Sequence, residues 1–581
     1  MTKPNAISSE LRESIWALRP YWTRTLFLSI VTGTLSLAPT LYMLEVYDRV
    51  VNSASLITLA MLTLLVLGVY VVMEVLEWVR VEMMQHAGQQ LDDRLGERVF
   101  DAVFAANLRK VQAGGSQALT DMRTLREFFY SPVLLGAMEA PVALLFLVLI
   151  FLISPVLGWF AVLGAMAQLL IAVMTERRTQ PPLAEANKAA IGAQGYATGA
   201  LRNAQVIESM GMLEGIHRRW MQRQRKFLLL QAEASDHAGG LTAASKSVQL
   251  IQSSALLGLG CWLMLQGELA GGGGMMIVGS ILGGKVLQPL VQVVSNWKLV
   301  INVRDAFQRL DNLLQQVPAG AERMSLPAPR GYLSVEAVTA GAPGSPVAIL
   351  RNVSFALPAG QCLAIVGPSA SGKTTLARLM MGLWPTLAGK IRLDGADMFA
   401  WNKTELGPFV GYLPQGVELF DGTLAENIAR FGEIDREKVE EAARLIGLDA
   451  LAAELPQGYD SRIGEDGAFL SGGQRQRVGL ARAIYGNPRF VVLDEPNSSL
   501  DERGEAALLQ MLQALKHRGV TVVVITHRTS VLAAADRMLI LRDGMVQGYG
   551  PRDEVLAALK KANEAAAQPA APSLPAAGAT A

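Results

Sequence analysis

The chain has 581 residues, of which 51% are hydrophobic and 18% are charged, and its mean hydropathy of +0.29 is high for a soluble protein and indicates membrane-spanning segments. A formal net charge of +1 gives no electrostatic basis for nucleic-acid binding, so we expect no nucleic-acid partner. The two cysteines, Cys261 and Cys362, lie far apart and form no metal-binding or disulfide pattern.

The first segment, residues 1–24, is polar and carries Lys3, Arg12 and Arg19. No short apolar core with a small-residue cleavage site follows it, so we expect no removable signal peptide. The sequence predicts a cytoplasmic N-terminal segment that leads directly into a membrane span.

Residues 25–315 contain six apolar stretches, each close to the ~20 residues that a helix needs to cross a ~30 Å hydrocarbon core. The third and fourth stretches are separated only by Ser154 and Pro155, which predicts a tight helical hairpin. The sixth is the least clear, because it is Gly-rich and contains Lys285 and Pro289. We predict a helical transmembrane domain with spans at about 25–46, 56–79, 132–153, 155–176, 247–266 and 274–297.

The connections between these spans alternate in length. Residues 47–55 and 267–273 are short and almost uncharged, whereas residues 80–131 and 177–246 are long and rich in Arg, Lys, Glu and Gln. The positive-inside rule places both long loops and the N-terminus in the cytoplasm. Apolar residues in the long loops recur at helical spacing, so we expect helices that continue the spans well beyond the bilayer.

Two ionisable residues fall inside predicted spans. Lys285 lies about midway along the sixth span, and Glu139 lies near the start of the third. A charge at the bilayer centre costs about 3 kcal/mol or more, so such side chains usually face protein or a water-filled path. Two interpretations of Lys285 stay open: it lines a translocation path, or it forms an internal ion pair or extends its ammonium to the membrane surface.

The remainder of the chain changes character. Residues 316–330 contain three prolines and predict a linker. In residues 331–562 short apolar runs alternate with helical segments, which predicts an α/β domain. Residues 563–581 are rich in Ala and Pro and cannot bury a core, so we predict a disordered tail.

The first functional motif of the α/β domain is a phosphate-binding pattern. Residues 367–374 match G-x-x-x-x-G-K-[ST] between a strand-like run and a helix-like run, which is the context that a P-loop requires. Backbone N–H groups and the new helix would face phosphates, Lys373 would reach the outer phosphates, and the Thr374 hydroxyl would bind Mg²⁺. The candidate nucleotide-binding residues are Gly367, Pro368, Ser369, Ala370, Ser371, Gly372, Lys373, Thr374 and Thr375.

Two further motifs follow the P-loop. Phe490–Asp494 is an apolar strand that ends in a carboxylate, and such strand ends lie where nucleotides bind in α/β sheets. Asp494 suits the Mg²⁺ shell, and the adjacent Glu495 is placed to polarise an attacking water as general base. The turn Ser471-Gly472-Gly473-Gln474 begins a predicted helix, and it is either a second anion-binding helix N-terminus or an ordinary capped helix start.

Taken in order, the three motifs resemble those of ABC-transporter ATPases over roughly residues 332–562, and the Ser471–Gln474 turn is similar to the signature sequence of that family. The resemblance implies ATP and Mg²⁺ as cofactors. It further implies that Gln415 is the Q-loop glutamine that senses Mg²⁺ and nucleotide state, that Asp501 lies in the D-loop, and that His527 is the switch histidine that contacts the γ-phosphate.

One position departs from the family pattern. Family members usually place an aromatic residue near position 342 to stack on adenine, whereas this chain has Ala342 there. Tyr332 is an aromatic candidate, but it lies ten positions too early. The adenine-stacking residue therefore stays open.

The resemblance also implies an assembly. In this family the P-loop of one ATPase domain faces the signature of another, and this chain has one of each, so a homodimer is expected. The order of spans and ATPase is that of exporters, whose cytoplasmic loop tips dock on the ATPase; residues 105–117 and 203–213 are the candidates, with an ordinary turn as the alternative. The expected fold is a six-helix transmembrane domain of the type I ABC exporter kind, followed by an α/β P-loop nucleotide-binding domain.

The membrane half carries a narrower resemblance. Residues 39–50 and 76–80 look like the permease–ATPase of bacterial type I secretion, in the branch that exports metalloproteases, and residues 1–24 are too short for a peptidase domain. The resemblance implies a multi-pass protein of the bacterial inner membrane with both termini in the cytoplasm. It also implies a periplasmic adaptor, an outer-membrane channel and an unfolded protein substrate with a C-terminal signal.

Two alternatives to protein secretion remain at this stage. The first is a lipid, drug or peptide exporter of the same architecture. The second is a nucleotide-gated membrane protein that does not pump, which the presence of both Glu495 and His527 disfavours.

Overall fold

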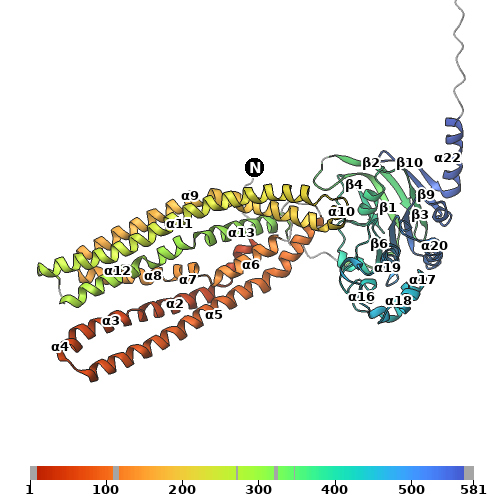
Figure 1. The fold of residues 1–581 in the computed structure, drawn as a ribbon. Helices are drawn as coiled ribbons and strands as arrows, with labels where there is room; N and C mark the ends of the chain where they lie inside the picture. The colour runs from red at the N-terminus through yellow and green to blue at the C-terminus, as the bar shows by residue number, and fades with distance from the viewer. Residues whose placement is uncertain (1–8, 109–116, 270–271, 319–324, 346, 568–581) are drawn as a thin grey trace, which may run out of the picture. The chain divides into compact units, whose positions relative to one another are not determined.

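The computed structural model describes residues 9–108, 117–269, 272–318, 325–345 and 347–567. The chain divides into two compact units, Met1–Asn107 with Gln112–Ala319 and Leu108–Val111 with Gly320–Ala581. Each unit is described by itself below (Figure 1).

The first unit is helical throughout its described residues (Figure 1). Its α-helices are α1 (Glu10–Trp16), α2 (Arg19–Leu35), α3 (Ala38–Glu45), α4 (Val51–Ser53), α5 (Leu56–Leu108), α6 (Gln117–Phe129), α7 (Pro132–Met138), α8 (Ala140–Ile153), α9 (Pro155–Arg202), α10 (Ala204–Ser209), α11 (Leu213–Leu265), α12 (Gly272–Ser295) and α13 (Trp297–Gln316).

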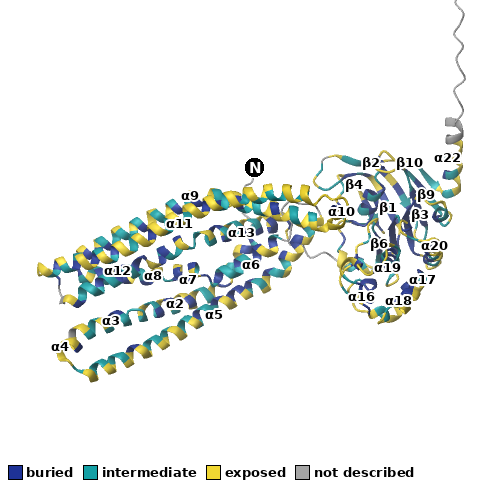
Figure 2. Cartoon of the chain, in the orientation of Figure 1, coloured by how far each residue is buried: buried dark blue, intermediate teal, exposed yellow. Residues whose placement is uncertain are grey.

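Three helices are much longer than a membrane span. Helices α5 and α11 have 53 residues each and α9 has 48. At 1.5 Å per residue each is about 70–80 Å long, more than twice the thickness of a hydrocarbon core. Large apolar side chains stay exposed along their apolar halves (Figure 2), as in Leu64 of α5 and Leu170 of α9, which suits contact with lipid.

Within the described residues, five helices are long and apolar enough to cross a membrane, or six if the pair α7 and α8 forms one span. The sequence predicts an uninterrupted third span, but α7 and α8 are bent by 47° where they meet at Glu139. Pro141 lies in the first turn of α8 and has no N–H to donate to Ala137, so the helical ladder is broken there.

The structure of residues 47–55 also differs from the short connection that the sequence predicts. A π-helical turn, Val46–Val50, continues α3 into α4, so most of this segment is helical. An ion pair between Arg49 and Glu45, with a nitrogen–oxygen distance of 2.8 Å, joins positions one turn apart and favours the helix. The chain leaves the helix at Ala54, whose φ is 50°.

The second unit contains two sheets (Figure 1). The larger sheet has the order β10-β9-β3-β8-β7-β6 and is parallel except for β10. Its strands are β3 (Cys362–Val366), β6 (Val410–Leu413), β7 (Phe490–Asp494), β8 (Thr521–Ile525), β9 (Arg537–Arg542) and β10 (Met545–Pro551). The smaller sheet is antiparallel, with the order β2-β1-β4-β5, and contains β1 (Leu333–Gly341), β2 (Ala348–Leu357), β4 (Ala388–Leu393) and β5 (Ala396–Asp397).

Strands β7 and β8 of the larger sheet are buried along their whole length, because both faces of the sheet are covered. In β3, Leu363 and Ile365 enter one hydrophobic cluster while Cys362 and Ala364 enter the other, as the two-residue period of a strand requires. The parallel order places the carboxyl ends of β3, β8, β7 and β6 side by side.

The helices of the second unit are α14 (Lys373–Met380), α15 (Lys403–Leu406), α16 (Leu424–Ile428), α17 (Arg436–Leu445), α18 (Asp449–Glu454), α19 (Gly472–Ile484), α20 (Glu502–His517), α21 (Thr529–Leu532) and α22 (Arg552–Ala567). Helix α22 ends at Ala567, five residues beyond the predicted domain boundary at 562, and the disordered tail predicted from residue 563 stays a prediction. Residues 568–581 lie outside the described part of the chain.

Candidate nucleotide-binding and catalytic site

The P-loop occupies the turn between the end of β3 and the start of α14. Gly372, which precedes the helix, has a φ of 99°, a conformation that glycine adopts without steric cost. A Cβ at Gly367 would lie 2.1 Å from the carbonyl oxygen of Leu541, so only glycine fits there. Both fixed glycines of the pattern are therefore required by the backbone.

The Lys373 side chain folds into this loop. It is buried, and its ammonium donates hydrogen bonds of 2.8 Å to the carbonyl oxygens of Gly367 and Pro368. Burial lowers the pKa of Lys373, and the carboxylates of Glu495 and Asp494 oppose that change. A cation is thus held where the sequence predicts phosphate binding.

Asp494 ends the buried strand β7 beside Thr374. Only 1% of Asp494 is exposed, and neither carboxylate oxygen accepts a hydrogen bond from the described residues. Burial raises the pKa of Asp494, while the neighbouring Thr374 hydroxyl and the cations Arg378 and Lys373 oppose the rise. A buried carboxylate with unsatisfied oxygens beside a hydroxyl offers the oxygen ligands that Mg²⁺ prefers, so these residues fit the cation.

Gln415 and His527 approach Glu495 from the two neighbouring strands. The Gln415 side-chain amide donates a hydrogen bond of 3.0 Å to Oε2 of Glu495, and Nε2 of His527 lies 3.8 Å from Oε1. These residues follow β6, β7 and β8, which are adjacent in the sheet. The Glu495 side chain is 28% exposed, so water can reach a carboxylate whose orientation is fixed from both sides.

Glu495 also has an unusual backbone conformation. Its φ is 51°, in the left-handed region that few residues other than glycine adopt. Its N–H donates to the carbonyl of Ile525, and its own carbonyl accepts a hydrogen bond of 3.4 Å from the Gln476 amide. Such local strain is commonly found at functional sites, where the surrounding structure maintains it.

The signature turn forms the N-terminus of α19. The Ser471 hydroxyl accepts from the N–H of Gln474, and Oε1 of Gln474 accepts from the N–H of Ser471 at 2.8 Å, which is a reciprocal capping box. The turn, including Gly473, borders a cavity of about 430 Å³ together with Ser499 and Asp501. No P-loop residue lines this cavity, so one chain holds the two motifs at separate places.

The Asp501 side chain forms hydrogen bonds within its own unit. Its carboxylate caps α20 by accepting from the N–H of Gly504 at 2.9 Å, and it binds the Arg477 guanidinium at 2.8 Å. The Gly504 N–H, followed by Arg477, lowers the pKa of Asp501. The carboxylate therefore stays ionised beside the signature helix.

Two polar side chains that sequence reasoning missed support the site. Gln476 is buried and donates at 3.0 Å to the carbonyl of Pro496, next to the contact with Glu495 described above. Arg378 stands one turn after Thr374 on α14, with its guanidinium 4.8 Å from the centre of the Trp384 ring. The one-turn spacing from Thr374 was the available signal for Arg378; Gln476 had none beyond its place in the signature helix.

Arg430 was also missed, and it joins the signature helix to the sheet. Its guanidinium donates to the carbonyls of Arg482, Ala483 and Tyr485 at 2.9–3.2 Å, at the C-terminal end of α19. It also donates at 2.8 Å to the carbonyl of Gly407, in the 3₁₀ turn before β6, and at 3.0 Å to the carbonyl of Val410, the first residue of β6. A cation at a helix C-terminus is electrostatically favourable.

The structure excludes one candidate for the adenine-stacking residue. Gly341, at the end of β1, pairs with Ala348 of β2, and a Cβ at Gly372 of the P-loop would touch Leu350 of β2. The end of β1 near Ala342 is therefore the one beside the P-loop. Tyr332 precedes the opposite end of this nine-residue strand, about 30 Å away, and is too distant to replace the aromatic residue.

Known protein families match both halves of the chain. Residues 22–281 match the family described as ABC transporter transmembrane region, and residues 350–498 match the family described as ABC transporter. Among solved structures, a bacterial Atm1-family ABC exporter with ATP bound superposes with a TM-score of 0.81 at 23% identity, covering 95% of this chain and 99% of that one, and it shows the fold alone.

Characterised relatives are similar over nearly the whole length. The type I secretion system ATP-binding protein PrsD of Rhizobium meliloti (strain 1021) is 38% identical over 530 residues, which cover 91% of each chain. The leukotoxin translocation ATP-binding protein LktB of Mannheimia haemolytica is 27% identical over 552 residues, covering 93% of this chain and 76% of the relative.

Proposed function

Since this chain belongs to the ABC transporter family, we propose that it is the combined permease and ATPase of a bacterial type I protein secretion system. It is a multi-pass membrane protein, and its ATP hydrolysis is coupled to protein export. The observation that carries the proposal is the arrangement of Gln415 and His527 around Glu495, in a chain related to a secretion ATP-binding protein over both its units.

The chemistry of hydrolysis is assigned to this chain's own residues. Lys373 and the P-loop amides bind the phosphates, Glu495 accepts the proton of the attacking water, and His527 contacts the γ-phosphate. Thr374, Gln415 and Asp494 would hold Mg²⁺, which supplies charge neutralisation on the phosphates when bound. Gln415 holds the Glu495 carboxylate in position through its 3.0 Å hydrogen bond.

The separation of P-loop and signature supports a homodimer. The cavity beside Ser471–Gln474 and Asp501 contains no P-loop residue, so we propose that it faces the P-loop of a second copy across bound ATP. Each copy would then complete the other's site. ATP binding would close the two ATPase units, and hydrolysis would release them.

The remaining assignments follow from the family and the charge pattern. We place the transmembrane domain at 25–315 and the ATPase domain at 331–562, in the bacterial inner membrane with cytoplasmic termini. Helix α10, within 203–213, is the proposed ATPase-docking tip; most of the other candidate, 105–117, lies outside the described residues. Partners would be a periplasmic adaptor and an outer-membrane channel, and the substrate an unfolded protein with a C-terminal signal.

Vesicle transport tests this proposal. Full-length protein reconstituted with its ATPase units outward should move a candidate secreted protein into a protease-protected lumen only with ATP and Mg²⁺, and a chelator should stop both transport and ATP turnover. Movement of a labelled lipid without protein uptake would instead favour the lipid exporter. ATP binding without turnover or vectorial movement would favour the gated, non-pumping protein.

The Lys285→Met variant tests the membrane path. The Lys285 ammonium donates hydrogen bonds of 2.9 Å to the Ser36 carbonyl and hydroxyl, so methionine removes a charge and a bridge from α12 to the residue that follows α2. We expect protein uptake into vesicles to fall about tenfold, with an unchanged unfolding midpoint of the ATPase unit. Lys298→Met, which removes an exposed lysine of α13, is the matched control. Normal uptake by Lys285→Met would reject a role for Lys285 in transport.

A further inference from the structure

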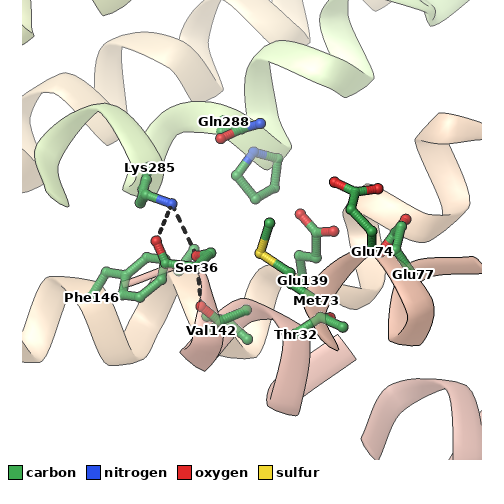
Figure 3. A pocket seen from close by; sticks show the side chains of 13 residues that line it. Thr32, Ser36, Met73, Glu74, Glu77, Glu139, Val142, Phe146, Lys285 and Gln288 are labelled. Carbon is green, nitrogen blue, oxygen red and sulfur yellow. Dashed lines mark hydrogen bonds between the residues drawn. The ribbon is translucent and has the colours of Figure 1, made fainter. Parts of the chain in front are cut away.

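A polar cavity lies among the apolar helices of the first unit. It has a volume of about 230 Å³ and is lined by residues of α2, α5, α8 and α12, with Glu139 at the start of α8 (Figure 3). A cavity of 150 Å³ holds a benzene ring, so this one has room for a long side chain. Figure 3 shows Lys285 on one side of it and Glu74 and Glu77 on the other.

Two of the membrane spans are interrupted where they border this cavity, and a third contains a proline. Helix α2 ends at Leu35, so that Ser36 precedes the start of α3; α7 and α8 bend at Glu139; and Pro289 lies inside α12. Because proline has no N–H, the carbonyl of Lys285 loses its helical donor. Interrupted backbone at membrane depth persists only where it is enclosed by protein or lines a water-filled space.

Most charges around the cavity are paired internally. The buried Arg80 donates two hydrogen bonds of 2.9 Å to Glu139 and one of 2.6 Å to Glu77. Lys285 is held by the Ser36 contacts, with its ammonium 5.8 Å from the centre of the Phe146 ring. Arg80 is thus paired with two carboxylates, whereas the Lys285 ammonium contacts neutral oxygen atoms and has no ion pair among the described residues.

Glu74 is the carboxylate of this cavity that has no partner among the described residues. It lines the cavity one turn before Glu77 on α5, and no hydrogen bond or ion pair joins it to any described residue. With Glu74, Glu77 and Glu139 facing two cations, Arg80 and Lys285, the surroundings of the cavity carry one excess negative charge. Glu74 is an exposed residue within the apolar part of α5, so its carboxylate requires water or a cationic partner there.

We propose that this cavity binds basic side chains of the transported polypeptide, with Glu74 as the recognising carboxylate. This inference rests on the proposed export of an unfolded protein. An ammonium or guanidinium would pair with Glu74, and its remaining N–H groups would meet Glu77, Gln288 and the carbonyl freed by Pro289. Specificity for lysine and arginine at this point would let basic segments enter the membrane without an unpaired charge.

A metal ion is a poorer occupant. Among the described residues, no group of three or more His, Cys, Asp or Glu side chains is placed to hold a metal ion, so the carboxylates here do not converge as a divalent cation requires. A lysine or arginine side chain carries several N–H donors that point in different directions, so it does not need carboxylates that converge on one point.

Thiol reactivity tests the inference in the full-length protein. Met73 lines the cavity next to Glu74, so Met73→Cys, made with Cys261→Ser in lipid nanodiscs, reports the local charge. We expect a cationic trimethylammonium methanethiosulfonate to react about tenfold faster than the anionic sulfonate reagent. A 20-residue Gly/Ser peptide with four lysines should slow the cationic reaction, and the same peptide with four glutamines should not.

Further variants separate recognition from folding. Added Glu74→Gln should abolish the reagent preference and the protection by the lysine peptide, whereas Glu74→Asp should keep both. Glu45→Gln, which removes a carboxylate outside this cavity, should also keep both. Equal rates for the two reagents with Glu74 present, or equal protection by the two peptides, would overturn the inference. Failure of the export proposal would appear separately, as absent protein uptake into vesicles.

Discussion

Replacing Glu495 with glutamine is expected to reduce ATP turnover by about 10²–10⁴-fold while ATP binding persists. The amide cannot accept a proton from water, yet it keeps the size of the side chain and can still contact Gln415, which lies 3.0 Å from Oε2. ATP and Mg²⁺ should then hold two copies together, because hydrolysis no longer separates them. Steady-state phosphate release and light scattering with ATP measure the two effects.

The control for this variant is Glu502→Gln. Glu502 lies in the first turn of α20, exposed and outside the site, and its loss should leave turnover within about twofold of the parent. If the Glu495→Gln protein bound ATP tightly and remained monomeric at all concentrations, the shared site would be refuted. Undiminished turnover would remove Glu495 from the role of base.

Replacing Arg430 with alanine is expected to destabilise the ATPase unit by about 3 kcal/mol or more. The five backbone carbonyls that it binds would lose their donor, and two of them lie at the first residue of β6 and in the turn before it, upstream of Gln415. Burial lowers the pKa of Arg430 to about 10, so the side chain remains a cation at neutral pH. Thermal unfolding of the full-length protein in detergent, monitored by fluorescence, measures the loss. The unfolding transition of the ATPase unit is the one that bound nucleotide shifts to higher temperature.

A second arginine of the same unit provides the comparison. Arg436 is exposed and pairs with Asp460 at 2.9 Å, so Arg436→Ala should cost at most about 1 kcal/mol. Arg430→Lys should fall between the two, since an ammonium has three donors where a guanidinium has five. Equal midpoints for Arg430→Ala and Arg436→Ala would show that Arg430 does not join α19 to the sheet.

Much of the ATPase unit could be predicted because its functional residues lie in short, contiguous sequence motifs. The glycines at 367 and 372 are fixed by a close backbone approach and a positive φ, and both appear as a pattern in the sequence. Likewise, the membrane domain could be predicted from its long apolar stretches. The bend at Glu139 was not predicted, because hydropathy over a window does not register how one proline, Pro141, breaks the hydrogen-bond ladder.

The order of motifs along the chain was sufficient to establish a nucleotide-driven membrane transporter, since each motif is local and its spacing to the next is visible. Which distant groups meet was decided by packing alone. Lys285 reaches Ser36 across 249 positions, and Arg430 spans 52 positions to the carbonyl of Arg482. No periodicity encodes such pairs, because they exist only once helices and strands from separate parts of the chain lie side by side.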